Sequence, residues 1–577
     1  MSGICGWMGN APVGTLDLML EAIDYRGDQT DRWHSEEAAL GYRWWGDRPG
    51  KSPSIHRAAP HFVACAGSLA PPRENPAAAM PDILGGRLDT VDGAFVAAHW
   101  DAGAGRLTLI RDPFGVRSLY YLEHGGVLYF ASELKQLLAI PNLPIALNYP
   151  ALHKYLTFSF VPGEDVPIRG VRRLLPGQVL HAQSGGIVTR PYFILREEIN
   201  PALGDRKAAV KLIRSRMRDG IRRRLNGESE VAVFLSGGID SSAVAHWLTR
   251  EGVKVRPFSL DFGRDSVEKE QAATVASTLG LDLQWVPMDG SELAPVLMDL
   301  VWKLDLPFGD AVTGPQYLLA RRAREAGLSC VYNGEGGDQL FGGWTSKPMI
   351  AAELYSGMFA AREDSREARY LRSYHRFYGR EDLLYSASFH AEIGPPGTRR
   401  ALLAPYLESG EADTFLNRVR LADIHLKGSQ NILPRAERTA NGWGIDVRVP
   451  LFDRALAETS FQLPPEMKLH GACEKYVLKL IMSKYFPREI VWRKKFGMSV
   501  PITRWTLGPL AAPLHDLLSA QSLKRRDLFR PEYVATMLAG RNDADDVRRR
   551  RVGERLWCLA MLEAWLRIFV DGKGRRP

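Results

Sequence analysis

Short apolar runs broken by glycine and proline characterise the first 195 residues of the chain. In "LTLIRD" and "VLYFAS", apolar and polar positions alternate, which is the pattern of a strand with one face on a core. Similar runs recur in "SLYYLE", "QVLHA" and "GIVTRPYF". The pattern predicts a strand-rich amino-terminal region in which two sheets pack face to face.

A different pattern begins at about Lys207, where "KAAVKLIRSRMRDGIRRRL" is typical of a long amphipathic helix. Strand-like and helix-like stretches then alternate before the chain becomes mostly helical, an order that indicates a parallel sheet with crossover helices. We therefore predict two domains, 1–195 and 206–577, with the boundary in "REEINPALGDR". The stretch 345–430 has no pattern from which a role follows.

Composition narrows the class of protein. Of the 577 residues, 45% are hydrophobic and 24% are charged, as in ordinary multidomain globular proteins. The net charge of +9 is a modest basic excess, and we expect no nucleic-acid partner. The densest basic run, "DDVRRRRVGERLW", adjoins apolar residues at helical spacing, so we interpret it as the solvated face of a helix. Those apolar residues are Leu556, Leu559, Leu562 and Trp565.

Cysteine spacing and hydropathy indicate a cytoplasmic protein. The cysteines form no CxxC pair, which argues against a disulfide or zinc scaffold. Acidic residues interrupt the first thirty positions, where a signal peptide would be apolar, and no apolar run is long enough to cross a bilayer. We therefore expect no membrane partner, and we leave a homodimer open.

The segment "VAVFLSGGIDSSAVAHWL" carries the strongest chemical signal. Its first residues read as a buried strand and its last as a helix with an apolar face, so a glycine-rich turn joins a strand to a helix N-terminus. Backbone N–H groups and the helix dipole make such a turn an anion site. The turn offers Gly237 and Gly238 for close approach, hydroxyls from Ser236, Ser241 and Ser242, and Asp240 as a magnesium ligand.

The "SGGIDSS" turn resembles the pyrophosphate loop of the ATP pyrophosphatases, and the chain as a whole resembles the asparagine synthetase family. The resemblance implies an α+β two-sheet sandwich of the N-terminal nucleophile type, followed by an α/β ATP-pyrophosphatase domain. It also implies ATP and Mg²⁺ as cofactors, with Leu235, Ser259 and Gly334 as further ATP-binding residues.

Further motifs extend the resemblance towards the carboxyl terminus. "NGEGGDQLFGGW" is similar to the family's GEGxDExxxGY signature, which implies Asp338 as a second magnesium ligand and Glu335 as a catalytic residue. "EKYVLK" resembles GKxxLR and implies that Lys475 and Lys479 contact phosphates. "WRKKFGMSVPITRW" resembles RxKxGFSxPxxxW and places Lys495 at the family's essential lysine. "DLPFGD" and "IDVRVPLFD" match two other family segments.

The amino-terminal domain resembles the family's glutaminase domain but lacks its chemistry. Ser2 stands where the nucleophilic cysteine is expected, and Ala66 stands where an asparagine would supply an oxyanion donor. The segment between Ala70 and Asp92 also lacks the stretch whose acid holds the glutamine amine. Because losing one oxyanion donor alone costs about 10²–10³ in rate, we predict an inactive glutaminase domain.

These features predict an AMP-forming amide synthetase. A small-molecule or peptide carboxylate would be adenylated by ATP and then joined to an amine that the substrate itself carries, as in β-lactam synthetases and lasso-peptide macrolactam cyclases. One alternative is an asparagine synthetase that uses free ammonia. An alternative of another class is a nucleotide-binding regulator without catalysis, which ATP–pyrophosphate exchange would distinguish.

Overall fold

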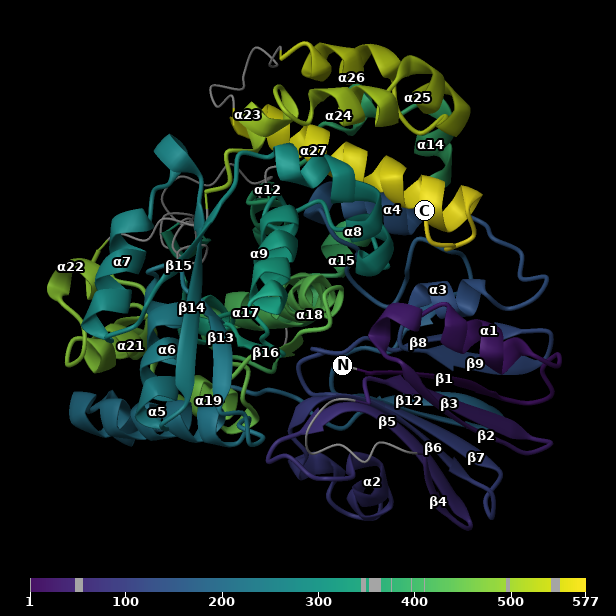
Figure 1. Ribbon diagram of the computed structural model, residues 1–577, viewed down its shortest axis with the longest axis horizontal. Helices are drawn as coiled ribbons and strands as arrows, with labels where there is room; N and C mark the ends of the chain where they lie inside the picture. Colours follow the sequence, from purple (N-terminus) through teal and green to yellow (C-terminus); the bar gives the residue numbers. More distant parts are fainter. Residues whose placement is uncertain are drawn as a thin grey trace.

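The computed structural model describes residues 2–46, 55–343, 349–351, 365–374, 376–395, 397–408, 410–493, 499–540 and 550–577. Two antiparallel sheets make up the amino-terminal part, and a parallel sheet with many helices makes up the rest (Figure 1). Both sheet arrangements confirm the fold predicted from the sequence.

The two antiparallel sheets have six strands each. The first contains, in spatial order, β10 (Arg172–Arg173), β8 (Tyr120–His124), β9 (Val127–Ala131), β1 (Ser2–Met8), β3 (Ala38–Trp44) and β2 (Gln29–His34). The second contains β12 (Gly186–Pro191), β11 (Gln178–Gln183), β7 (Arg106–Arg111), β6 (Gly93–Asp101), β5 (His61–Leu69) and β4 (His56–Ala58).

Alternation along the strands builds the core of this sandwich. In β6, Val96, Ala98 and Trp100 belong to the apolar cluster between the sheets. The intervening Phe95 and Ala97 belong to a second cluster, on the outer face, which α2 (Pro76–Leu84) covers. Because successive side chains point to opposite faces, one strand contributes to both apolar layers.

The outer face of the first sheet is covered by α1 (Thr15–Glu21) and α3 (Leu134–Leu138). The apolar cluster beneath them includes Leu20 and Leu137. It continues into Trp302 of α8 (Leu297–Leu304) and Trp565 of α27 (Arg550–Leu566). The amino-terminal part and the carboxyl-terminal helices therefore share one apolar core.

The parallel sheet has five strands in the order β15 (Gln284–Pro287), β14 (Lys254–Asp261), β13 (Glu230–Phe234), β16 (Cys330–Tyr332) and β17 (Asp446–Arg448). All its pairings are parallel. The chain moves from β13 first to one side and later to the other, so β13 marks the point where the strand order reverses. Ligands bind at the carboxyl ends of strands at such a point.

Helices connect and cover this sheet. α6 (Ile239–Arg250), α7 (Lys269–Thr278) and α9 (Thr313–Glu325) all contact β14, and α5 (Arg206–Arg222) packs on α6. After β16 come the short α10 (Gly337–Phe341) and a series of small helices that includes α12 (Arg366–Arg372) and α17 (Phe415–Ala422). A π-helical segment, η6 (Asp423–Ile432), leads into α18 (Leu433–Asn441).

The carboxyl-terminal helices before α27 are α21 (Tyr476–Met482), α22 (Arg488–Val491), α23 (Ile502–Thr506), α24 (Ala511–Leu517), α25 (Ala520–Arg526) and α26 (Pro531–Leu538). The first two pack at the parallel sheet, where α21 contacts α5 and α6, and later ones pack on α27 (Figure 1). Of these, α23, α24 and α26 contact α27 directly.

The predicted solvated face of α27 is wrong at Glu554 and Arg555. Arg555 is buried, and its Nε donates to the Arg376 carbonyl oxygen at 3.3 Å. Glu554 pairs with the Arg376 guanidinium at 2.6 Å. Glu554 and Arg555 are thus paired with Arg376 inside the protein and do not form a solvated face.

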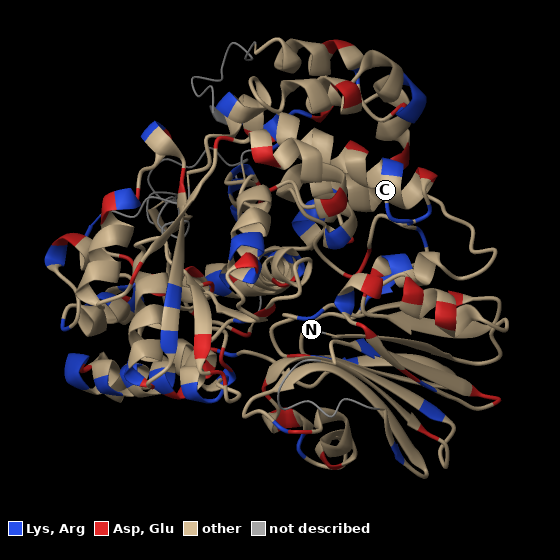
Figure 2. Ribbon diagram, viewed as in Figure 1, with Lys and Arg blue, Asp and Glu red and all other residues tan. Residues whose placement is uncertain are grey.

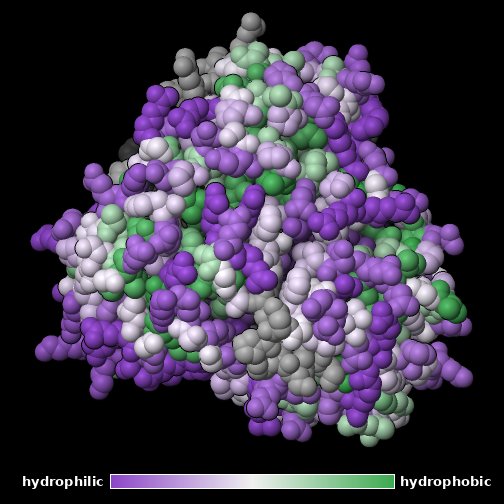
Figure 3. Space-filling model, in the orientation of Figure 1, coloured by the Kyte–Doolittle hydropathy of each residue, from purple (hydrophilic) through white to green (hydrophobic). Residues whose placement is uncertain are grey.

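Charged residues of both signs are interspersed along the ribbon (Figure 2). Hydrophobic and hydrophilic residues also mix on the face shown in Figure 3. No helix within the described ranges combines the length and apolar character that crossing a membrane requires.

Candidate active site

The turn between β13 and α6 is tight and is held by serine hydroxyls. Ser236 Oγ accepts a hydrogen bond from the Gly238 N–H at 3.2 Å and lies 3.2 Å from the Ser241 hydroxyl. The Ser242 hydroxyl donates to the Gly238 carbonyl oxygen at 2.8 Å. Gly237 has a φ of 71°, and a Cβ there would lie 2.5 Å from a backbone nitrogen of α7, so this position requires glycine. The N-terminus of α6 thus faces the space beyond the turn, where an anion would be favoured.

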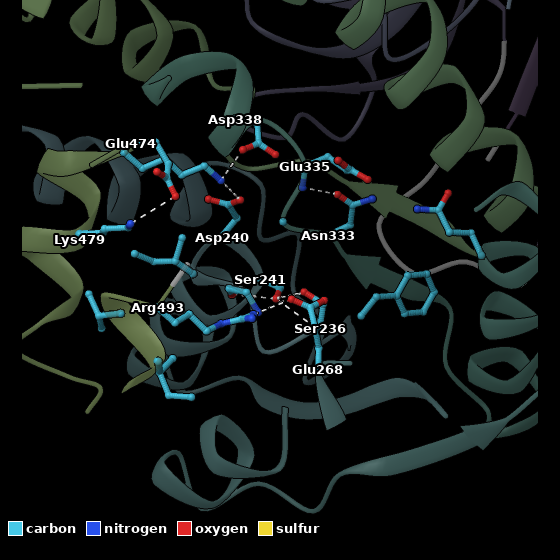
Figure 4. A pocket seen from close by; sticks show the side chains of 18 of the residues that line it. Ser236, Asp240, Ser241, Glu268, Asn333, Glu335, Asp338, Glu474, Lys479 and Arg493 are labelled. Atoms are coloured by element: carbon cyan, nitrogen blue, oxygen red, sulfur yellow. Dashed lines mark hydrogen bonds and ion pairs between the residues drawn. The ribbon is translucent and has the colours of Figure 1, made fainter. Parts of the chain in front are cut away.

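A cavity of about 260 Å³ lies at the carboxyl ends of β13 and β16 (Figure 4). The residues predicted from the sequence that line it are Ser236, Gly238, Asp240, Ser241, Gly334, Glu335, Asp338, Lys475 and Lys479. Leu235 and Ser259 line a second, adjoining cavity. Gly237 and Ser242 shape the turn without lining either cavity, and Lys495 lies outside the described residues.

Asp240 and Asp338 bring two carboxylates to one end of the cavity, as Figure 4 shows. Lys475 Nζ forms ion pairs with both: it contacts Asp240 Oδ2 and lies 2.8 Å from Asp338 Oδ1. Burial alone would lower the pKa of the Lys475 ammonium group, but the two carboxylates raise that pKa above its ordinary value. Lys475 therefore stays charged, although its side chain is buried.

Glycines keep space open beside the two acids. A Cβ added at Gly337 would overlap the Asp240 carboxylate, and one at Gly343 would overlap the Asp338 carboxylate. Asp240 Oδ1 is buried and has no hydrogen-bond partner among the described residues. Carboxylate oxygens are ligands that Mg²⁺ prefers, so these residues fit such an ion. Within the described ranges no group of three acidic, histidine or cysteine side chains forms a metal cluster. A bound ion would therefore also need phosphate oxygens.

Some lining residues were not predicted from the sequence. Arg493 Nη2 lies 2.6 Å from Glu268 Oε1, and Lys479 Nζ lies 3.4 Å from Glu474 Oε1. Arg493 stands in the same "WRKKFG" stretch as Lys495, and Glu474 directly precedes Lys475, so both were close to recognised motifs. Glu268 lies in no such motif and reaches the cavity only through the fold.

A further wall of the cavity consists of Gln316, Asn333 and Glu335. The Glu335 N–H donates to Asn333 Oδ1 at 2.7 Å, which fixes the backbone of the loop after β16. Glu335 Oε1 lies 3.8 Å from Arg435 Nη2. Asn333 belongs to the "NGEGGD" motif, whereas Gln316 and Arg435 had not been assigned a role.

The amino-terminal site differs from a working nucleophile site. Ser2 is 2% exposed, and its Oγ accepts a hydrogen bond from the Gly67 N–H at 3.2 Å. The Ala66 side chain lies in the apolar cluster between the sheets and offers no donor. Arg448 of β17 donates to Ser68 Oγ at 2.7 Å, so the parallel-sheet domain contacts the same strand. Cys5 belongs to the cluster on the outer face of its sheet, and burial raises the pKa of its thiol.

Family models match both parts of the chain. The family model described as "Asparagine synthase" matches residues 212–567, and the model described as "Glutamine amidotransferase domain" matches residues 85–193.

Several curated relatives are similar over most of their length. The chain is 25% identical over 507 residues to the asparagine synthetase (glutamine-hydrolyzing) 1 of Bacillus subtilis, covering 83% of this chain and 78% of that protein. It is 28% identical over 517 residues to a putative asparagine synthetase (glutamine-hydrolyzing) of Mycobacterium bovis, covering 84% and 78%. It is 26% identical over 506 residues to the amidase chyE of Penicillium rubens, covering 75% and 73%.

Proposed function

This chain belongs to the asparagine synthase family and is an ATP-dependent, AMP-forming carbon–nitrogen ligase. On that premise we propose that its amine does not come from glutamine and is carried by the carboxylate substrate itself. The product would then be an intramolecular amide, as in a macrolactam or β-lactam.

The observation that carries this proposal is the state of the amino-terminal site. An N-terminal serine can act as a nucleophile when its own amine is the base. Here, however, the Ser2 hydroxyl is buried, and its oxygen accepts a hydrogen bond from the Gly67 N–H. Ala66 supplies no second donor. A tetrahedral oxyanion at this site would lack the stabilisation that acyl transfer from glutamine needs.

The cavity in the parallel-sheet domain suits adenylation. The nucleoside of ATP would bind near Leu235 and Ser259, and its phosphates would lie against the turn at Ser236 and the N-terminus of α6. Asp240 and Asp338 would hold Mg²⁺, which supplies charge neutralisation for the departing pyrophosphate when bound. Lys475 adds positive charge beside the two acids, and Arg493, which pairs with Glu268, lies beside the turn, where its Nη2 donates to the Gly237 carbonyl oxygen at 3.3 Å.

The two chemical steps then follow. An oxygen of the substrate carboxylate attacks the α-phosphorus, the bond to pyrophosphate breaks, and an acyl-adenylate forms. The amine attacks the acyl carbon, and AMP leaves with the electron pair of the broken C–O bond. Lys495, which lies outside the described residues, is the cation that the family resemblance assigns to the forming oxyanion.

The first testable prediction concerns products. The purified protein is supplied with Mg²⁺, ATP and a panel of carboxylates, including short peptides with a free amino terminus and one Asp or Glu side chain. We expect AMP and pyrophosphate in equal amounts, with loss of water from the peptide measured by mass spectrometry. Added glutamine should release no glutamate, and Ser2→Ala should behave like the wild type. Glutamate release that Ser2→Ala abolishes would contradict the proposal.

A second candidate is an asparagine synthetase, because the two relatives of that name cover 83% and 84% of this chain. L-Aspartate with ammonium chloride, and L-aspartate with glutamine, therefore belong in the same panel. Asparagine formed from ammonium chloride alone would favour the free-ammonia alternative. ATP–pyrophosphate exchange in the presence of any carboxylate would exclude a regulator without catalysis.

A further inference from the structure

The first cavity has a polar wall that lies apart from the groups suited to the nucleotide. The cavities share Phe234, Ser236, Glu268 and Leu319, so a nucleotide can extend from the second cavity into the first. The phosphate end of the first cavity is occupied by the turn, the two acids and Lys475. The wall of Gln316, Asn333 and Glu335 lies outside both regions. The cavity is also lined by Ile490 and Val491, but these apolar side chains offer nothing to hold a carboxylate or an amine, whereas the wall of Gln316, Asn333 and Glu335 is polar.

Behind this wall, the guanidinium group of Arg435 in α18 contacts oxygen atoms of residues from several segments of the chain. Its Nε donates to Gln316 Oε1 at 2.9 Å, and its Nη1 donates to Asp310 Oδ2 at 2.8 Å and to Asn431 Oδ1 at 3.5 Å. Its Nη2 lies 3.8 Å from Glu335 Oε1. Every nitrogen of the guanidinium group thus faces an oxygen of the protein, and the side chain is 4% exposed.

The groups around Arg435 differ from it in exposure. The side chains of Asp310 and Glu335 are 27% and 28% exposed, so both carboxylates border accessible space. Burial alone would raise the pKa of Asp310, but the Arg435 guanidinium lowers it below its ordinary value, so this carboxyl is ionised. An ionised carboxylate only accepts hydrogen bonds. Asp310 is not among the residues that line the cavity and lies behind the wall with Arg435, so the carboxylate that the wall presents to a hydrogen-bond donor such as an amine is that of Glu335.

We propose that Arg435 is a positioning residue that is held in place by Asp310 and in turn fixes Glu335 as the acceptor for the attacking amine. Arg435 touches neither reactant, because its nitrogen atoms are engaged by protein oxygens. The assignment rests on the proposed function. It gives the two half-reactions to different groups: the residues around Arg435 serve amide formation, whereas the turn, Asp240 and Asp338 serve adenylation.

The step at this wall is balanced without another reactant. The amine nitrogen forms a bond to the acyl carbon, and the acyl C–O bond breaks with its electron pair going to the phosphate oxygen of AMP. One N–H proton passes to the Glu335 carboxylate and from there to solvent. Proton transfer to a positioned carboxylate typically contributes about 10²–10⁴ in rate, so misalignment of Glu335 should be measurable.

The test separates the two half-reactions in the full-length protein. Adenylation is measured as ATP–pyrophosphate exchange with the peptides of the panel above after their amino termini are acetylated, so that no amine can attack. Amide formation is measured with the same peptides carrying a free amine. The variants are Arg435→Lys and Asp310→Asn. The matched control is Arg321→Lys, which changes a solvent-exposed arginine of α9 that pairs with Glu325 at 2.8 Å. Thermal unfolding reports whether each variant folds.

In Arg435→Lys and Asp310→Asn we expect exchange within about threefold of the wild type and amide formation lowered by about 10²-fold. Arg321→Lys should change neither rate. An equal loss of exchange and amide formation in both folded variants, or no loss of amide formation, would overturn the assignment. If the wild-type protein exchanges pyrophosphate with no carboxylate of the panel, the proposed function fails, and the assignment fails with it.

Discussion

At the scale of single residues, the cavity depends on glycines as much as on charged groups. Gly337 and Gly343 flank Asp338 in the "GEGGDQLFGGW" stretch. Their missing side chains leave room for the carboxylates of Asp240 and Asp338. The motif therefore brings the two acids together, and its glycines omit the Cβ atoms that would collide with the acid side chains. This explains why the stretch needs glycine at positions that do not bind anything.

The prediction at this scale is that Gly337→Ala abolishes most of the adenylation activity while the protein still folds. Alanine is a better helix former than glycine, so α10 should persist, but its Cβ would displace the Asp240 carboxylate. A displacement of this size should lower ATP–pyrophosphate exchange by about 10²-fold. Gly204→Ala is the control, because nothing lies near a Cβ added there. Equal exchange rates for the two variants would show that the Asp240 position is not critical.

At the scale of elements, α27 shows that packing decides which faces of a helix are buried, even where the sequence looks amphipathic. Its apolar residues Leu556, Leu559 and Leu562 are all fully buried. Trp565 Nε1 donates to the Asp305 carbonyl oxygen at 3.1 Å, and its ring stacks on Phe569 with centroids 5.3 Å apart. The helix is the centre of the carboxyl-terminal helices and also belongs to the core shared with the amino-terminal domain.

We predict that Leu559→Ala destabilises the protein far more than Leu507→Ala does. Leu559 is fully buried, and its truncation should cost about 3–5 kcal/mol of unfolding free energy through lost burial and a cavity. Leu507 is 42% exposed, so the same substitution there should cost less than about 1 kcal/mol. Urea denaturation followed by circular dichroism measures both. Similar costs for the two variants would contradict a central position for α27.

At the scale of the whole molecule, buried charges join the two domains. Glu437 of α18 accepts hydrogen bonds from Arg26 Nη1 at 2.9 Å and from Arg117 Nη1 at 2.6 Å. Arg117 Nη2 also donates to Asp446 Oδ1 of β17 at 2.8 Å. Both arginines come from the amino-terminal domain. Removing that domain would take away both arginines and leave Glu437 and Asp446 with only the partners of their own domain, among them Arg438 and Arg448. The domain thus has a structural role even without glutaminase chemistry.

These buried pairs predict a specific dependence of stability on pH. Burial alone would raise the pKa of Glu437, but the Arg26 and Arg117 guanidinium groups lower it to about 2. Because the folded-state pKa lies below the unfolded value, the stabilisation is present above about pH 4.5 and is lost as the pH falls towards about 2. Glu437→Gln should therefore lower stability at neutral pH and flatten its decline over that range.

The control is Glu458→Gln, which changes a surface pair with Arg454 whose glutamate side chain is 44% exposed. It should change stability by less than about 1 kcal/mol at any pH. Chemical denaturation at a series of pH values measures both variants. If the slope of stability against pH is the same for Glu437→Gln and the wild type, Glu437 does not contribute as the structure indicates.

The sequence by itself determined the features that depend on neighbouring residues. The short apolar run "VLYFAS" predicted a strand, now seen as β9, whose residues are all buried because both faces of the sheet are covered. The turn at 235–238 was predicted from glycine and serine between a strand and a helix, since its geometry is local. The boundary between 195 and 206 stays a prediction, although β12 ends at Pro191 and α5 begins at Arg206.

Only the tertiary structure decided which distant residues meet. Lys475 lies between Asp240 and Asp338, and Arg435 faces Glu335 and Asp310, across separations in the chain that no local pattern encodes. The buried environment of Arg555 was likewise not predictable, because a basic run has the same sequence whether its partners are water or groups of the protein. Local steric and hydrogen-bonding preferences act between neighbouring residues, whereas ion pairing and burial depend on which segments the folded chain brings together.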